Sequence, residues 1–392
     1  MSDVFSTLDA LPMEHGDLDN AVGKLGELPT LIAVVGSSGK SIASCALSSI
    51  LSGQGKGVGL FLHCLPDDDS RIYVNGKPVS TSEIEDAYKE LRKPIAKARL
   101  SKEQALYLIA LHIFASKGLD YGVVEFDVGG YSSSCYADSL RYEMTVLTST
   151  GLDHGDVLGS TESEVALDCV SAASEASTLV SYELGELVLP PVEEYVRKNE
   201  IKWVKGDAFH FDHLVEDCFR FDYFPYKDLG VFTKLRAHLS SISLAIEGAR
   251  HLLDLNEDKL KSSLASCQLP FHGDEQDGVI PLICSNVEMA YSLARSAPTL
   301  RKGRPSSVLF ACKKGCNAAS ILPILDNAFG QVMLTGIEGD PSYWGEDDFF
   351  LFLEDHPFVP SIEEAKAKLP EGGVLILASD EEFLSRSGYE GR

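Results

Sequence analysis

Short apolar runs alternate with longer amphipathic stretches along the first 150 residues. The runs contain many β-branched residues and predict buried strands. They cover residues 31–35, 58–62, 121–126 and 144–148. The stretches between them predict helices at 40–54, 82–99 and 101–118. Strands that alternate with helices in this way build a parallel sheet covered by helices.

A second series of the same kind follows a segment without periodicity. That segment, residues 270–278 (PFHGDEQDG), collects Pro, Gly and acidic residues and is typical of a linker. Strands are predicted beyond it at 279–284, 306–311, 330–336 and 373–378, and helices at 286–296, 317–328 and 362–368. We therefore expect an α/β chain with a parallel-sheet domain over 1–275 and a smaller Rossmann-like domain over 279–392.

Composition narrows the classes of function. The 392 residues are 44% hydrophobic and 24% charged, which is typical of a folded globular chain. The 34 Lys and Arg against 59 Asp and Glu leave a net charge of −25, which disfavours partners such as nucleic acid or a membrane surface. No apolar stretch long enough for a membrane span and no signal-peptide pattern is visible, so we expect a cytoplasmic protein. Nine irregularly spaced cysteines predict reduced thiols rather than a disulfide framework.

The segment 31–41, LIAVVGSSGKS, is a buried strand that runs into a turn of small residues and then a helix. Backbone N–H groups of such a turn, together with the positive end of the helix, can wrap a phosphate. Lys40 would supply charge, and Ser41 would supply a magnesium ligand. Only a shortened form of the phosphate-binding pattern is present, because Val34 stands where the first glycine of the full pattern would fall. An ordinary strand-to-helix turn is the alternative.

Two more predicted strands end in polar residues at the same edge of the sheet. The strand in 121–130 (YGVVEFDVGG) ends near Glu125, whose carboxylate could hold magnesium directly or through water. The segment 148–159 (TSTGLDHGDVLG) places Asp153 and His154 just past a third strand. A loop histidine with ordinary hydrogen bonds is the alternative for His154. Three strand ends that converge on one edge are what a site for phosphate and metal needs.

These segments resemble the folylpolyglutamate synthase and dihydrofolate synthase family, within the Mur ligase group. Residues 36–41 (GSSGKS) are similar to the family's G-T-N-G-K-G-S, and residues 71–80 (RIYVNGKPVS) to its R-I-x-I-N-G-x-P-I-S. Residues 125–130 (EFDVGG) are similar to E-V-G-L-G-G, and residues 150–159 (TGLDHGDVLG) to I-G-L-D-H-x-x-x-L-G. The resemblance implies a Mur-ligase-like P-loop ATP-binding domain followed by a Mur-ligase-like C-terminal domain.

The resemblance implies an ATP-dependent ligase that turns a carboxylate into an acyl phosphate and joins it to an amino group, with glutamate as the added amine. Its cofactors would be ATP and Mg²⁺, and its partners a folate-like or other carboxylic acid and glutamate. The residues that would cradle the phosphates are Gly36, Ser37, Ser38, Gly39 and Lys40. The residues that would hold magnesium are Ser41, Glu125 and His154. Lys40 and His154 would be the catalytic residues.

Several positions depart from the family's pattern. The family's carbamylated lysine, which completes a magnesium site, falls on Cys169, and cysteine cannot form that carbamate. The adenine-facing asparagine falls on Ile242, and the arginine at the domain junction has no counterpart beyond His272. Cations that could replace the lost charge are each expected to be solvated at the surface. They are Lys234, Arg236, Arg250, Lys313 and Lys314.

These departures leave two alternatives to an active ligase open. One is a catalytically degenerate relative that keeps nucleotide binding and works through a protein partner. The other is a phosphoryl-transfer or NTP-hydrolysing enzyme that uses only the site in the first domain.

Overall fold

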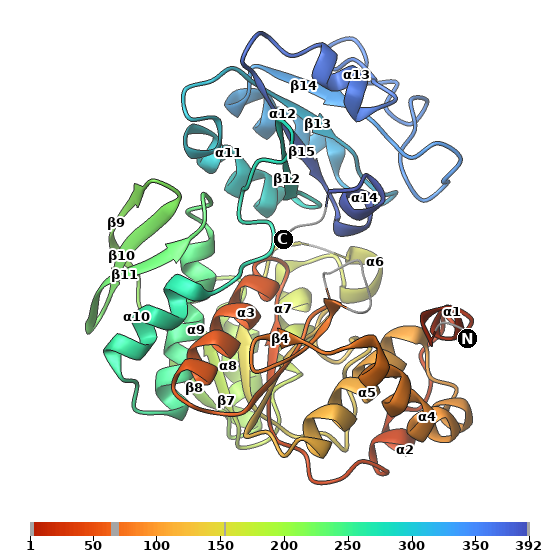
Figure 1. The fold of residues 1–392 in the computed structure, drawn as a ribbon, viewed down its shortest axis with the longest axis vertical. Coiled ribbons are helices and arrows are strands. Elements are labelled where there is room, and N and C mark those ends of the chain that lie inside the picture. Colours follow the sequence, from red (N-terminus) through yellow and green to blue (C-terminus); the bar gives the residue numbers. More distant parts are fainter. Residues whose placement is uncertain (1–3, 64–69, 153, 390–392) are drawn as a thin grey trace. The chain divides into compact units, whose positions relative to one another are not determined.

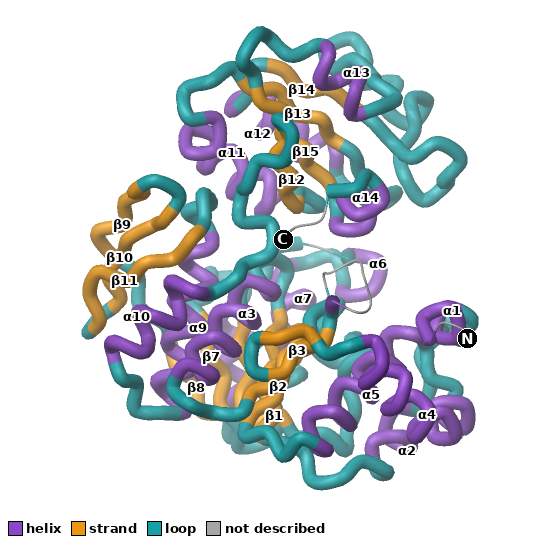
Figure 2. The backbone as a smooth tube through the Cα atoms, in the orientation of Figure 1, coloured by secondary structure: helices purple, strands orange, loops and turns teal. Residues whose placement is uncertain are grey.

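The computed structural model describes residues 4–63, 70–152 and 154–389, which form two compact units (Figure 1). The first unit runs to His210 and also includes Asp222–Leu229 and Ser240–Cys267. The second unit comprises Phe211–Phe221, Gly230–Leu239 and the chain from Gln268 onward. Strands alternate with helices in each unit, so the predicted α/β class is confirmed (Figure 2).

The first unit is built on a large, mostly parallel sheet. Its strands are β1 (Thr30–Val35), β2 (Val58–Phe61), β3 (Ile72–Val74), β4 (Lys77–Pro78), β5 (Tyr121–Glu125), β6 (Tyr142–Leu147), β7 (Thr178–Ser181) and β8 (Lys202–Lys205). Within the described residues the strand order is β4-β3-β2-β5-β1-β6-β7-β8. The strands from β2 to β8 in this order are parallel, and β3 and β4 add an antiparallel hairpin. All four strands predicted for this part of the chain are present.

Helices cover both faces of this sheet, which explains why Leu31–Val35 of β1 are buried throughout. Three of these helices begin with a Ser or Thr capping box, at Ser80, Ser101 and Thr161. The helices up to residue 266 are α1 (Val4–Asp9), α2 (Leu18–Val22), α3 (Lys40–Gly53), α4 (Thr81–Ala98), α5 (Lys102–Ser116), α6 (Gly155–Leu158), α7 (Glu162–Val170), α8 (Leu189–Lys198), α9 (His238–Leu252) and α10 (Glu257–Ser266). The predicted helices at 40–54, 82–99 and 101–118 correspond to α3, α4 and α5.

A separate three-stranded sheet was not visible in the hydrophobic pattern. Its strands are β9 (His210–Val215), β10 (Cys218–Tyr223) and β11 (Tyr226–Phe232), in the order β11-β10-β9. Most side chains of β9 are exposed, so this strand lacks the alternation of apolar and polar residues that marks a strand with one buried face.

The second unit contains a parallel sheet of its own. Its strands are β12 (Val279–Ile283), β13 (Ser306–Phe310), β14 (Gln331–Leu334) and β15 (Val374–Ser379), in the order β12-β15-β13-β14. Its helices are α11 (Val287–Arg301), α12 (Ala318–Ala328), α13 (Ile362–Ala367) and α14 (Glu381–Arg386). The predicted end of α11 at 296 is wrong, because Ala297 and Leu300 continue the buried face of the helix past that point. In the part of the chain that is described, no helix has the length and apolar character needed to cross a membrane.

Candidate active site

The predicted site lies at the carboxyl ends of three neighbouring strands in the first unit. β1 pairs in parallel with β5 on one side and with β6 on the other. The loop that begins at Gly36 follows β1, Glu125 is the last residue of β5, and Ser149 follows β6. The three predicted strand ends therefore meet at one edge. Asp153, which the sequence placed beside them, lies outside the described residues.

Two glycines allow the turn between β1 and α3. Gly36 has a φ of 132° and Gly39 a φ of 77°, conformations that residues with a Cβ rarely adopt. A Cβ on Gly36 would lie 2.4 Å from Thr148 Oγ1, and a Cβ on Gly39 would lie 2.2 Å from Ser241 Oγ. Both positions of the loop therefore require glycine.

The segment after β6 holds the first half of this loop. Ser37 N–H donates to the carbonyl oxygen of Ser149 (3.2 Å), and Ser38 N–H donates to Ser149 Oγ (2.9 Å). Within the described residues, no hydrogen bond engages the N–H groups of Gly39, Lys40 and Ser41. Those three amides, at the positive end of the 14-residue helix α3, are the ones available to an anion.

Lys40 and Ser41 are half-buried where α3 begins. Lys40 Nζ donates to the carbonyl oxygen of Gly36 (2.9 Å), so the lysine side chain folds back over the loop. Ser41 Oγ donates to Glu125 Oε1 (2.7 Å), and the second carboxylate oxygen accepts from the His63 backbone N–H (3.2 Å). Glu125 is only 2% exposed. A hydroxyl in contact with a carboxylate is a pair of hard oxygen donors, so Ser41 and Glu125 fit a magnesium ion.

His154 is exposed and caps the short helix α6 with a φ of 46°. Across the described ranges, no three His, Cys, Asp or Glu side chains converge as a metal-binding group. Ser41 and Glu125 are thus the two predicted ligands that the structure brings into contact, and a ligand role for His154 stays a prediction.

Comparisons with known proteins point to folylpolyglutamate synthases. No family model matches the chain. A probable folylpolyglutamate synthase from Schizosaccharomyces pombe is 30% identical over 200 residues, 42% of this chain and 39% of that protein. Folylpolyglutamate synthase from Lacticaseibacillus casei is 26% identical over 198 residues, 48% of this chain and 45% of that protein. The chain therefore spans less than half the length of the curated relatives that it matches.

The similarity of fold extends over the whole chain. A crystal structure of Mycobacterium tuberculosis folylpolyglutamate synthase, complexed with ADP and AMPPCP, has a TM-score of 0.85 and 16% identity. The superposition covers 99% of this chain and 98% of that chain. This chain has the folylpolyglutamate synthase fold. The resemblance that the sequence motifs indicated is confirmed.

Cys169, on which the sequence resemblance places the family's carbamylated lysine, is a buried thiol. Cys169 lies in α7 and is 1% exposed. Burial raises the pKa of its thiol to about 12, although the nearby charge of Lys40 opposes the shift. Cys169 therefore contributes no negative charge to the site near neutral pH.

We expect Cys169 to resist alkylation while the protein is folded. With a pKa of about 12, its thiolate fraction near pH 8 is on the order of a thousandfold below that of a free cysteine. The measurement is iodoacetamide labelling with and without urea, read by mass spectrometry of the peptide, with the half-buried Cys218 as the internal comparison. Rapid labelling of Cys169 in the folded protein would contradict the conclusion that this thiol is buried and protonated.

The cations that could replace the charge of the family's lost arginine each pair with an acidic side chain. Ion pairs join Lys313 to Glu382 (2.6 Å), Lys314 to Asp348 (3.0 Å), Arg236 to Asp212 (2.5 Å) and Arg250 to Glu247 (3.2 Å). The prediction that Lys234 is solvated is wrong, since this residue is 6% exposed. Its Nζ donates to Gly273 O (3.0 Å) and to Asp274 Oδ1 (3.1 Å), which offsets the cost of burying the charge.

Ile242 is fully buried in α9, so it is part of the core. The family's pattern has an arginine at the domain junction, and His272 is the cation nearest to that position in this sequence. His272 pairs with Asp274 through Nε2 (2.8 Å). The structure thus offers no sign that either position has regained the function it has in the family's pattern.

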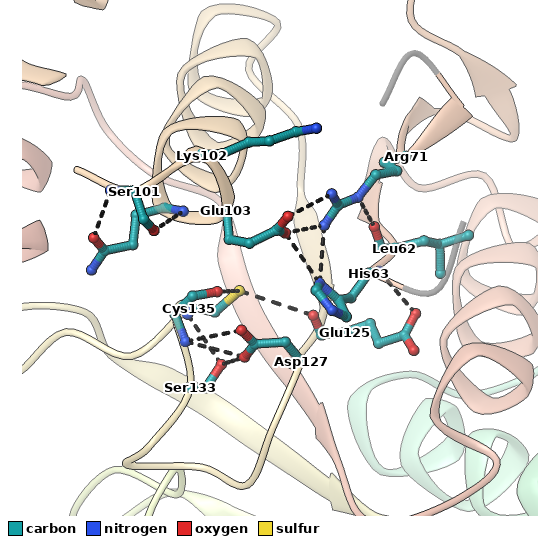
Figure 3. Close-up of polar contacts among 12 residues, drawn as sticks. Leu62, His63, Arg71, Ser101, Lys102, Glu103, Glu125, Asp127, Ser133 and Cys135 are labelled. Carbon is teal, nitrogen blue, oxygen red and sulfur yellow. Dashed lines mark hydrogen bonds and ion pairs between the residues drawn. The ribbon is translucent and has the colours of Figure 1, made fainter. Parts of the chain in front are cut away.

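Sequence reasoning missed a polar cluster formed by His63, Arg71 and Glu103, which is joined to Glu125 through the His63 amide (Figure 3). One available signal was the capping box of Ser101 and Gln104, which places Glu103 in the first turn of α5. A second available signal was the motif at 71–80, because it begins with Arg71. The motif by itself indicated no role for this arginine.

Proposed function

We propose that the chain is an ATP-dependent carboxylate–amine ligase of the folylpolyglutamate and dihydrofolate synthase type. Its cofactors would be ATP and Mg²⁺, and its substrates a folate-like or other carboxylic acid and glutamate. The observation that carries this proposal is the contact of Ser41 Oγ with the Glu125 carboxylate at 2.7 Å, beside a helix start whose first amides have no partner among the described residues. A phosphate cradle next to a pair of metal ligands is what phosphoryl transfer needs. The nucleotides in the similar Mycobacterium tuberculosis enzyme support the proposal.

Each group at this edge has a definite task in such a reaction. The amides of Gly39 to Ser41 and the Lys40 ammonium would bind phosphate oxygens and hold the terminal phosphoryl group in place. Ser41 and Glu125 would hold magnesium, which when bound supplies positive charge at the phosphates. The carboxylate oxygen of the acid takes the phosphoryl group as ADP leaves. The amine of glutamate then attacks the acyl carbon, and phosphate departs with that oxygen.

Two further parts of the proposal concern the whole chain. Residues 1–275 would form the ATP-binding domain and residues 279–392 the C-terminal domain. The protein would work in the cytoplasm, which is supported by the free thiols among the described cysteines, because such thiols persist in a reducing compartment.

The test is ADP release from ATP with each substrate supplied alone and then together. We expect release only when Mg²⁺, glutamate and an acid such as dihydropteroate or a folate are all present, with the ligated product detected by mass spectrometry. ADP release without the acid would favour the NTP-hydrolysing alternative. ATP binding without any release would favour the degenerate relative.

A further inference from the structure

An ion pair between the buried Arg71 and the half-buried Glu103 is linked through His63 to the Glu125 carboxylate (Figure 3). Arg71 precedes β3, and only 4% of its side chain is exposed. Its guanidinium donates through Nη1 to Glu103 Oε1 (3.2 Å) and through Nη2 to Glu103 Oε2 (2.5 Å). It also lies over the Phe61 ring, 5.3 Å from the centroid. A two-pronged contact of this kind fixes both side chains in orientation as well as in distance.

The same guanidinium holds the chain where β2 ends. Arg71 Nε donates to Leu62 O (3.0 Å), and Leu62 N–H donates to Arg71 O (2.8 Å). His63 Nδ1 lies 3.0 Å from Arg71 Nη2 and 3.2 Å from Glu103 Oε2. Nδ1 can either accept from Arg71 or donate to Glu103, so the same ring orientation is held in both tautomers of the imidazole. Residues 62 and 63 are therefore tied through both backbone and side chain.

This fixed segment reaches the candidate metal ligand through a single hydrogen bond. His63 N–H donates to Glu125 Oε2 (3.2 Å), while Ser41 Oγ donates to Oε1 (2.7 Å). Groups that hydrogen-bond to a metal ligand orient it, and the metal affinity depends on that orientation. We propose that Arg71 and Glu103 are positioning residues that fix the Leu62–His63 backbone, whose amide sets the orientation in which Glu125 meets a divalent cation. This inference rests on the proposed magnesium site.

The Glu103 carboxylate keeps its charge in this setting. Burial raises the pKa of Glu103, but hydrogen bonds from His63 and the charge of Arg71 outweigh burial and hold that pKa well below its usual range. A pair with a purely structural role would stabilise the fold and leave the metal affinity unchanged. Metal affinity therefore separates the two roles.

The experiment measures Mn²⁺ binding in the presence of AMPPCP by electron paramagnetic resonance in Arg71→Lys and Glu103→Gln. Lysine keeps the positive charge of Arg71 but cannot donate to both Glu103 oxygens at once. Glutamine keeps the shape of Glu103 but is uncharged. We expect Mn²⁺ to bind about 10- to 100-fold more weakly in both variants, the range for groups that orient metal ligands. AMPPCP affinity without metal should be unchanged, and turnover at saturating metal should return to that of the unmodified protein.

Two controls identify the group that acts. The first control is Lys102→Ala, next to Glu103 in sequence. The Lys102 ammonium pairs with Asp9 (2.6 Å), which lies outside the cluster, so this change should leave the metal affinity unchanged. His63→Ala keeps the amide and removes only the imidazole, so it should weaken Mn²⁺ binding less than either variant of the ion pair. Melting temperatures are measured alongside. If Arg71→Lys fails to fold, Glu103→Gln carries the test, because this side chain is 31% exposed and glutamine has its shape.

The other possible results separate the positioning role of the ion pair from the proposed metal site. Unchanged Mn²⁺ affinity in a folded Glu103→Gln variant overturns the inference and leaves the proposed function standing. A larger loss in His63→Ala assigns the effect to the imidazole and also overturns the inference. An unmodified protein that binds AMPPCP but no Mn²⁺ overturns the proposed metal site itself.

Discussion

Replacing Lys40 with alanine is expected to lower turnover by about 10²- to 10⁵-fold, the range for a cation that stabilises a transferring phosphoryl group. Lys40 Nζ reaches back to Gly36 O at 2.9 Å, so its charge already lies over the loop that would hold the phosphates. The side chain is half-buried, and its loss should cost little stability. The measurements are steady-state ADP release and calorimetric titration with AMPPCP.

A matched control lies beyond the other end of the same helix. Lys56 is also half-buried, and it follows the end of α3 at Gly53. Lys56→Ala should leave both turnover and AMPPCP affinity unchanged. If Lys40→Ala behaves like this control, the segment 36–41 is an ordinary strand-to-helix turn, and its assignment as a phosphate-binding loop is wrong.

Replacing Glu125 with glutamine is expected to lower kcat/KM at a fixed Mg²⁺ concentration by about 10²- to 10³-fold, because a metal ligand of full charge becomes neutral. Glutamine has the same shape, and its carbonyl oxygen can still accept one of the two hydrogen bonds that Ser41 and the His63 amide now donate. The loss should therefore appear in the metal requirement. A titration of turnover against Mg²⁺ measures it.

The control for this change is an exposed glutamate on the same sheet. Glu143 lies on β6 and pairs with Arg141 at 3.2 Å. Glu143→Gln should leave the Mg²⁺ dependence as it is. An unchanged dependence in Glu125→Gln as well would show that this carboxylate does not meet the metal.

The strands that the sequence predicted are apolar runs whose side chains are mostly buried on both faces. Leu31–Val35 and Val374–Leu377 are continuous apolar runs, and such runs arise because helices cover both faces of a parallel sheet. β7 (Thr178–Ser181) is also buried along its length but escaped prediction, because it begins and ends with a polar residue and has only two apolar residues between them. β9 escaped because its side chains are largely exposed and follow no period.

The candidate site was predictable only as far as strand ends define it. Glu125 and the loop from Gly36 follow directly from where β5 and β1 stop, since parallel strands bring their carboxyl ends together. The contacts that hold these residues come from far along the chain. Ser149 binds the amide of Ser38 across 111 residues, and the His63 amide reaches Glu125 across 62. Spacing in a single sequence carries no signal for such pairs.

The central claim is that a carboxylate becomes an acyl phosphate before the amine attacks it. The most direct measurement uses an acid whose reacting carboxylate carries ¹⁸O in both oxygens, incubated with ATP, Mg²⁺ and glutamate. We predict that mass spectrometry will find one ¹⁸O in the phosphate released for each molecule ligated, because the bridging oxygen leaves with phosphorus when the amide forms. Phosphate that carries only ordinary oxygen would contradict the account, since it would show that ATP is cleaved without any transfer to the acid.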